Sequence, residues 1–107
     1  MQPSSYANKN RTEYVKLLRR ALDDAFASQG VSRFQEGHDI DLSSTFSLFK
    51  HWEKTAGVEM PTTFYADVVA EATNAFLDTH DLVLQEYYLN IDTFSVRIRA
   101  RFHVSEK

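Results

Sequence analysis

Phe94-Ser-Val-Arg-Ile-Arg-Ala-Arg-Phe-His-Val104 alternates between apolar and polar residues without interruption. Such alternation is typical of a strand with one buried face, because successive side chains of a strand point to opposite sides. The face predicted to be buried carries Phe94, Val96, Ile98, Ala100, Phe102 and Val104. The opposite face carries Ser95, Arg97, Arg99, Arg101 and His103, with guanidinium groups about 6.6 Å apart along the strand. Like charges at this spacing repel, so we expect acidic groups opposite them.

The preceding segment, Leu82–Ile91, fits two templates. As a helix it aligns Leu84, Tyr87, Tyr88 and Ile91, and as a strand it places Val83, Tyr87, Leu89 and Ile91 on one side. Its density of aromatic and branched residues, and the turn residues of 90–93, favour a strand that forms a C-terminal antiparallel hairpin with the last segment. Since an isolated hairpin is marginally stable in water, it is expected to pack on helices and to gain a third strand. Two sources of that strand remain open: residues 31–41, or a partner chain.

Three helices are predicted before the hairpin. Asn10 and Glu13 have the spacing of a capping box, and an apolar stripe follows as far as Gly30. The second helix begins after a cap at Ser43 or Ser44 and ends near Gly57. Its apolar face is expected to contain Leu48, Phe49, Trp52 and Ala56. The third helix begins at Pro61, and its stripe is Tyr65, Val68, Val69, Ala72, Ala75 and Phe76.

The chain is therefore predicted to be a single α+β domain over residues 10–107, preceded by a flexible N-terminal arm at residues 1–9. The arm is polar, contains Pro3 and shows no periodicity. With 107 residues, 43% of them hydrophobic, the chain is long enough to build one core. The N-terminal residues lack the apolar stretch of a secretory signal, so we expect an intracellular (cytoplasmic) or virion-associated protein that is not secreted and has no membrane partner.

Charge is segregated along the chain, although the net charge is only −3. Residues 21–92 contain thirteen acidic residues and only three basic ones, Arg33, Lys50 and Lys54. Most other basic residues lie in the first helix and the last strand. Either the ends neutralise the middle within the monomer, or a basic and an acidic surface face different directions and attract a charged partner.

No motif specific for catalysis, a cofactor or a metal is present, so we expect a protein that is not an enzyme and has no cofactor. The chain has no cysteine, and its three glycines are isolated, which excludes thiolate sites and glycine-rich phosphate loops. The pairs His38-Asp39 and His80-Asp81 lack further ligands at helical spacing, so no metal site is predicted. Aromatic residues at helical spacing, such as Phe46, Phe49 and Trp52, are more often core than ligand pocket.

The candidate site is consequently the polar face of the last strand. Its predicted partner-binding residues are Arg97, Arg99, Arg101 and His103, joined by Arg19 and Arg20 of the first helix. One interpretation is a solvated sheet face, neutralised by Glu86 or Asp92 across the hairpin. The functional hypothesis is a protein–protein interaction module, a small accessory, assembly or inhibitory subunit that binds another protein or a second copy of itself through this strand. The alternative is a nucleic-acid-binding accessory factor that uses the Arg97/Arg99/Arg101 face, because guanidinium groups suit phosphate geometry.

Overall fold

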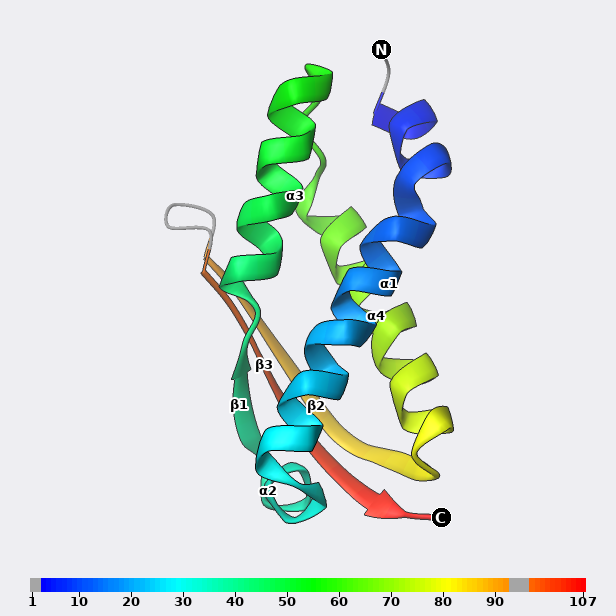
Figure 1. Ribbon diagram of the computed structural model, residues 1–107, viewed down its shortest axis with the longest axis vertical. Coiled ribbons are helices and arrows are strands. Elements are labelled where there is room, and N and C mark those ends of the chain that lie inside the picture. Colours follow the sequence, from blue (N-terminus) through cyan, green and yellow to red (C-terminus); the bar gives the residue numbers. More distant parts are fainter. Residues whose placement is uncertain (1–2, 93–96) are drawn as a thin grey trace.

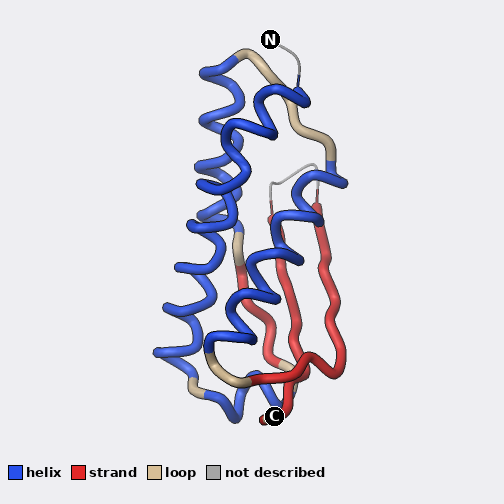
Figure 2. The backbone as a smooth tube through the Cα atoms, turned by 90° about the vertical axis from the view of Figure 1, so that its right-hand side faces the viewer, coloured by secondary structure: helices blue, strands red, loops and turns tan. Residues whose placement is uncertain are grey.

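The helices lie on one face of a three-stranded antiparallel sheet (Figure 1, Figure 2). The computed structural model describes residues 3–92 and 97–107. Its elements are α1 (Pro3–Gln29), α2 (Val31–Glu36), β1 (His38–Asp41), α3 (Ser43–Ala56), α4 (Thr62–Thr79), β2 (Leu82–Asp92) and β3 (Arg97–Glu106). The strand order is β1-β3-β2. The α+β fold and the C-terminal hairpin β2–β3 are confirmed, and residues 31–41 supply the third strand, preceded by the short helix α2.

The central strand β3 follows the alternation that its sequence predicts. Ile98, Ala100, Phe102 and Val104 are buried against the helices, whereas Arg99 and Arg101 are exposed on the opposite face. Residues 94–96, which belong to the same predicted stretch, lie outside the described residues. Because β1 and β2 both pair with β3, the last strand of the chain is the middle of the sheet.

A bulge in β2 changes which of its side chains face the helices. The pairing shifts between Leu84 and Glu86, so Gln85 has no partner on β3. An unpaired residue reverses the alternation beyond it. Leu84 and Tyr87 therefore lie on the inward side, and Val83 lies outward with 44% of its surface exposed. The prediction that Val83 shares a side with Tyr87 is wrong for this reason.

Helix α1 begins at Pro3, earlier than predicted. Residues 3–9, predicted as a flexible arm, belong to this helix, and the capping box at Asn10 and Glu13 is wrong because both residues lie inside it. Tyr6 accounts for the extension, since its ring is only 5% exposed and its hydroxyl bonds to that of Tyr14 at 2.8 Å. Asn10 supports the same turn by donating from Nδ2 to the carbonyl of Tyr6 at 3.0 Å.

The other two long helices follow the predictions more closely. In α4 the stripe from Tyr65 to Phe76 is buried, apart from the partly exposed Ala75. In α3 neither Ser43 nor Ser44 caps the helix; instead Asp41 Oδ1 accepts hydrogen bonds from the backbone N and Oγ of Ser43. Leu48 is 40% exposed and does not belong to the buried face of α3. No described helix is both long and apolar enough to cross a membrane.

Candidate functional site

The outward face of the sheet, on the side away from the helices, brings together polar residues of all three strands. The register places Asp39 and Asp41 of β1 opposite Arg101 and Arg99 of β3. On the other side of β3, Tyr88 and Asn90 of β2 pair with the same two arginines. A shallow pocket of about 210 Å³ lies here, lined by Asp39, Tyr88, Asn90, Arg99 and Arg101. We call this group the outer-face site.

Arg101 is already neutralised within the chain. Its Nε donates to Asp39 Oδ1 at 2.9 Å and its Nη2 donates to Asp39 Oδ2 at 3.1 Å, a bidentate pair. Glu86, expected to neutralise the stripe, instead accepts a hydrogen bond from the hydroxyl of Tyr88, which raises the pKa of that phenol. The partner of Arg101 therefore comes from β1 rather than from the hairpin, because only β1 brings a carboxylate into register with it.

Arg99 differs from Arg101 in having no carboxylate partner within the described part of the chain. Its side chain is exposed, between Asn90 and Asp41 in the sheet register. Tyr88, diagonal to it across the hairpin, is 57% exposed, the largest value among the exposed large hydrophobic side chains. Arg97 is the first residue of β3, but its side chain lies outside the described residues.

We expect Arg99→Ala to change the free energy of unfolding by less than about 1 kcal/mol, since an exposed charge without a partner contributes little to stability. The check is urea denaturation followed by Trp52 fluorescence. Arg101→Ala, which breaks an exposed ion pair, serves as the comparison. A loss of several kcal/mol for Arg99→Ala would show that its guanidinium is part of the structure of the monomer.

His103 lies on the same face but is partly covered by the end of α2. A Cβ atom built on Gly37 would come within 2.2 Å of His103 Nε2, so the imidazole packs directly on this glycine. Gly37 also has φ +85, a conformation that side chains disfavour. His103 is thus held by packing and is less accessible than Arg99.

We predict that Gly37→Ala lowers the free energy of unfolding by about 1–3 kcal/mol, because it combines left-handed strain with a clash against a packed ring. Thermal denaturation measured by circular dichroism tests this. Gly57→Ala is the control: Gly57 also has positive φ, but open space surrounds its missing Cβ. Equal losses for the two variants would show that the contact with His103 contributes nothing.

Arg19 and Arg20 do not join the arginines of β3. Both belong to α1, which packs on the other helices. Arg19 donates from Nη2 to Oγ1 of Thr79 in α4 at 3.1 Å. The predicted combination of helix and strand arginines in one basic patch is therefore not formed.

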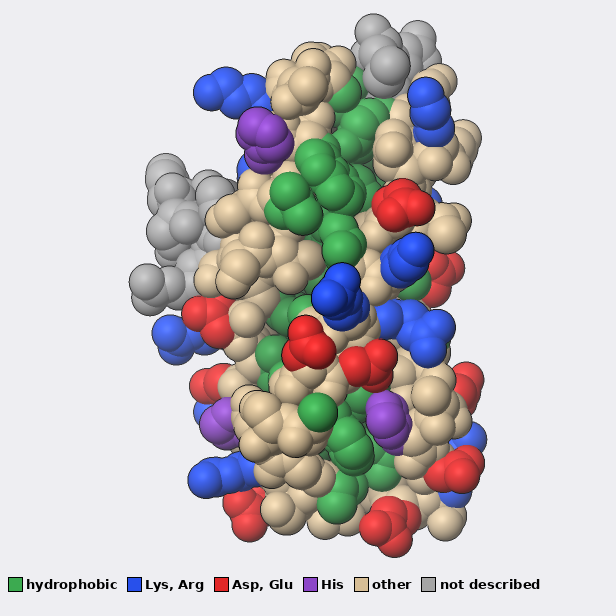
Figure 3. Space-filling view, viewed as in Figure 1, with side chains coloured by type: hydrophobic (Ala, Val, Ile, Leu, Met, Phe, Trp, Pro, Cys, Tyr) green, Lys and Arg blue, Asp and Glu red, His purple; other side chains and the backbone are tan. Residues whose placement is uncertain are grey.

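The helical side of the molecule carries an apolar groove between α1 and α3 (Figure 3). A pocket of about 400 Å³ lies between these helices, lined by Tyr6, Asn10, His51, Trp52, Thr55 and Ala56. Phe46 and Phe49 are fully buried, as expected for core, and Trp52 is partly buried at the edge of the groove. Within residues 3–92 and 97–107, no three histidine or carboxylate side chains are close enough together to hold a metal ion.

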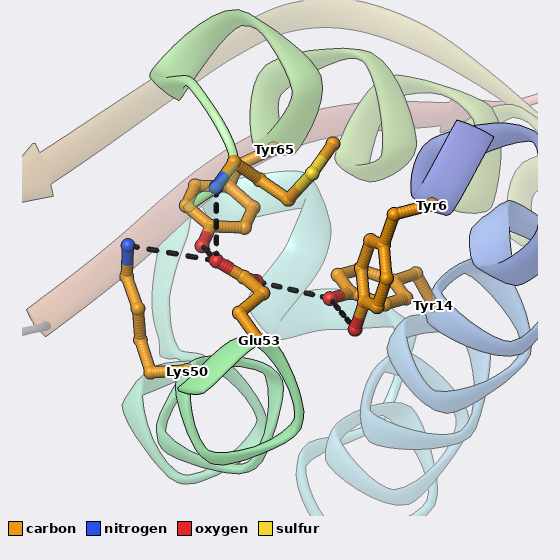
Figure 4. A network of polar contacts seen from close by, with 6 residues as sticks. Tyr6, Tyr14, Lys50, Glu53 and Tyr65 are labelled. Atoms are coloured by element: carbon orange, nitrogen blue, oxygen red, sulfur yellow. Dashed lines mark hydrogen bonds and ion pairs between the residues drawn. The ribbon is translucent and has the colours of Figure 1, made fainter. Parts of the chain in front are cut away.

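Sequence reasoning missed a buried polar cluster behind this groove (Figure 4). Glu53 of α3 is 2% exposed and accepts hydrogen bonds from Tyr14 of α1 at 2.9 Å and from Tyr65 of α4 at 2.5 and 2.7 Å. The backbone N of Met60 donates to the same carboxylate at 3.2 Å, and Lys50 Nζ lies 3.9 Å from it. One carboxylate thus joins three helices and the α3–α4 loop.

Burial raises the pKa of Tyr14 and Tyr65 well above the ordinary tyrosine range, and the hydrogen bonds to Glu53 raise both further. Each phenol therefore stays protonated and donates a hydrogen bond to the carboxylate. A sequence signal for the cluster exists: Glu53 lies four residues after Phe49 and seven after Phe46, on the buried face of α3. These contacts connect α1, α3, α4 and the α3–α4 loop, and we interpret the cluster as a structural feature.

Comparisons of the chain with protein-family models, with curated proteins and with solved structures find no match. The chemistry of its own surfaces is therefore the basis for assigning a function.

Proposed function

We propose that this protein is a non-enzymatic interaction module, a small accessory, assembly or inhibitory subunit that docks onto another protein through the outer-face site. One observation carries the proposal: the exposed guanidinium of Arg99 has no carboxylate partner among the described residues, and it lies beside the exposed Tyr88 on a sheet face that the helices leave free (Figure 2). Arginine and tyrosine are among the residues that most often dominate binding energy at protein interfaces.

The arrangement favours a partner that places a carboxylate on Arg99. Asp39 occupies both donors of Arg101 that point toward it, whereas the fork of Arg99 remains available for a bidentate contact. The ring of Tyr88 and the amide of Asn90 flank that position and would supply apolar contact and a further hydrogen bond. An acidic side chain of the partner fits this combination.

Residues 99–102 of β3 have no free edge to which a second copy could add a strand. β3 is paired on both edges, with β1 along residues 99–102 and with β2 along its whole length. Binding of a second copy through the last strand therefore remains a prediction that concerns the outward face of this strand rather than the edge of residues 99–102. A second copy would have to use the face of β3 or the edge of another strand.

The nucleic-acid alternative receives less support from the same surface. The described side chains of the outward face include three carboxylates, Asp39, Asp41 and Glu86, beside the guanidinium groups of Arg99 and Arg101. Carboxylates on the same face as these guanidinium groups would repel a phosphate backbone that binds there. We expect no retention of the protein on an immobilised oligonucleotide at low salt. Binding with a steep salt dependence that an Arg97/Arg99/Arg101→Glu variant loses would instead establish the alternative.

A photo-crosslinking experiment tests the proposal. A benzophenone amino acid is placed at Tyr88, or at the exposed Leu48 on α3 as a control, and the protein is irradiated in extract of its source cells. A discrete adduct is expected at position 88 alone. Arg99→Glu should abolish it, whereas Lys54→Glu, the same charge change on α3, should not. Equal adducts at both positions, or an adduct indifferent to Arg99→Glu, would overturn the proposal.

A further inference from the structure

The strand β2 forms a long edge of the sheet. It pairs with β3 on one side, and on its other side no described backbone group bonds to residues 83–92. The opposite edge, β1, is only four residues long, whereas β2 has eleven. A row of free N–H and C=O groups of this length is a template for pairing with another strand.

β2 lacks some of the usual protections of a sheet edge. The sequence Leu82–Asp92 contains no lysine, arginine or proline, the residues that natural edges use to prevent pairing. The bulge at Gln85 disturbs only the first part of the strand, and residues 86–92 pair with β3 in unbroken register. Seven consecutive residues are therefore regular enough to accept a neighbouring strand.

The inward row of β2 is also incompletely covered by the helices. Leu84, Tyr87, Leu89 and Ile91 are only partly buried, whereas the neighbouring inward row of β3 is fully buried. The hydroxyl of Tyr87 is out of contact with solvent and has no hydrogen-bond partner among the described residues. A further strand would lie about 4.8 Å beyond β2 and would cover this row with its own inward side chains.

The charge around this edge determines the kind of strand that fits. Residues 62–92, which form α4 and β2, contain six acidic residues and no lysine or arginine. Arg11 pairs with Glu71 and Lys107 with Asp78, but the exposed Asp67, Asp81 and Glu86 have no basic partner within the described chain. Because α4 packs on β2, this acidic character belongs to the side of the molecule where the free edge lies.

We infer that the free edge of β2 binds an extended segment of a partner protein by strand addition, and that this segment alternates apolar residues with lysine or arginine. Its apolar side chains would continue the inward row of Leu84, Tyr87 and Leu89, and its basic side chains would lie outward beside Glu86 and the ring of Tyr88. The inference goes beyond the proposed function, because it concerns a second surface and a basic rather than an acidic partner segment. It does not depend on Arg99.

The chain itself supplies a suitable probe. β3, which β2 already accepts on its other edge, has the required pattern, with apolar residues inward and arginines outward. A fluorescent peptide with the sequence Arg97–Glu106 is titrated with the full-length protein, and anisotropy reports binding. Hydrogen exchange then shows which amides become protected. The control peptides are a scrambled sequence that breaks the alternation and one in which every arginine is replaced by glutamate.

We expect saturable binding of the alternating basic peptide and new protection of amides within residues 86–92, with β3 remaining protected. Glu86→Lys should weaken binding at least tenfold, and Glu13→Lys, the same charge change on an exposed position of α1, less than twofold. Arg99→Glu should not weaken it, so failure of the outer-face site and failure of this edge are distinguishable.

Several results would overturn the inference. These are no binding at millimolar peptide, binding without protection of β2, equal binding of the scrambled peptide, or loss of protection in β3, which would mean that the peptide replaces that strand. Protection of β2 that rises with protein concentration in the absence of peptide, together with a dimer in sedimentation, would show that a second copy is the occupant.

Discussion

Replacement of Glu53 by leucine is expected to lower the free energy of unfolding by about 3–5 kcal/mol, because the variant leaves several buried donors without an acceptor. The carboxylate accepts the hydroxyls of Tyr14 and Tyr65 and the backbone N–H of Met60, and none of these groups can turn to water in the folded protein. Lys50 adds little, since its ammonium is 3.9 Å away and its side chain is 39% exposed. Urea denaturation of the variant measures the loss.

The triple variant Glu53→Leu, Tyr14→Phe, Tyr65→Phe separates the cost of unpaired donors from the loss of contacts. Removing both hydroxyls together with the carboxylate leaves only the N–H of Met60 and the hydroxyl of Tyr6 without a partner. The triple variant should recover at least half of the stability that Glu53→Leu loses, because replacing both members of a buried pair by apolar groups is nearly neutral. Glu13→Leu, at an exposed position of α1, is the matched control. A loss below about 1 kcal/mol for Glu53→Leu would show that the cluster is not a major source of stability.

The elements that could be predicted from the sequence are those whose signal is local. The alternation of β3 needs only the identity of its own residues, and the same holds for the apolar stripe of α4. For β2 the sequence favoured a strand over a helix, because aromatic and branched residues favour an extended, partly buried strand. The pairing of β2 with β3 was also predictable, because a hairpin joins strands that are close in sequence.

The features that escaped prediction depend on contacts between distant segments. Asp39 neutralises Arg101 only because β1 pairs with β3 across 62 positions of the chain. The bulge at Gln85 is decided by how β2 fits β3, and it reverses the side on which Val83 lies. The early start of α1 follows from the contact of Tyr6 with Tyr14. None of these pairings has a sequence pattern of its own.

The burial of Glu53 is also a feature that could not be predicted from the sequence, because it depends on side chains of distant segments. An acidic residue in a helix is normally exposed, and its place on the face of Phe46 and Phe49 is a weak signal on its own. Its burial is explained only once Tyr14 and Tyr65, from two other helices, are seen to donate to it. The outer-face site was easier to predict, because the alternation of β3 indicates exposed arginines. Only the structure shows that Arg101 is paired with Asp39, whereas Arg99 has no carboxylate partner among the described residues.

Alkaline conditions are expected to unfold this protein steeply above pH 10. Burial raises the pKa of Tyr87 to about 12 and also raises the pKa of Tyr14 and Tyr65 above the ordinary value. Below pH 10 the folded and unfolded chains both keep these protons, and stability is unaffected. Above the unfolded pKa of about 10, the unfolded chain releases them while the folded chain does not, so stability falls by about 1.4 kcal/mol per pH unit for each tyrosine. Three tyrosines together give about 4 kcal/mol per pH unit.

Because small domains have only about 5–15 kcal/mol of stability, the transition is expected to begin above about pH 11, with Tyr14 and Tyr65 kept protonated in the folded state by their raised pKa. Phenolate absorbance at 295 nm and circular dichroism should therefore change together for the buried tyrosines. Tyr87→Phe is the sharpest control: its hydroxyl has no hydrogen-bond partner among the described residues, so its removal costs no bond. The variant should reduce the slope of stability against pH by about a third. An unchanged slope, or phenolate absorbance that rises fully while the circular dichroism stays native, would show that these phenols ionise freely in the folded protein.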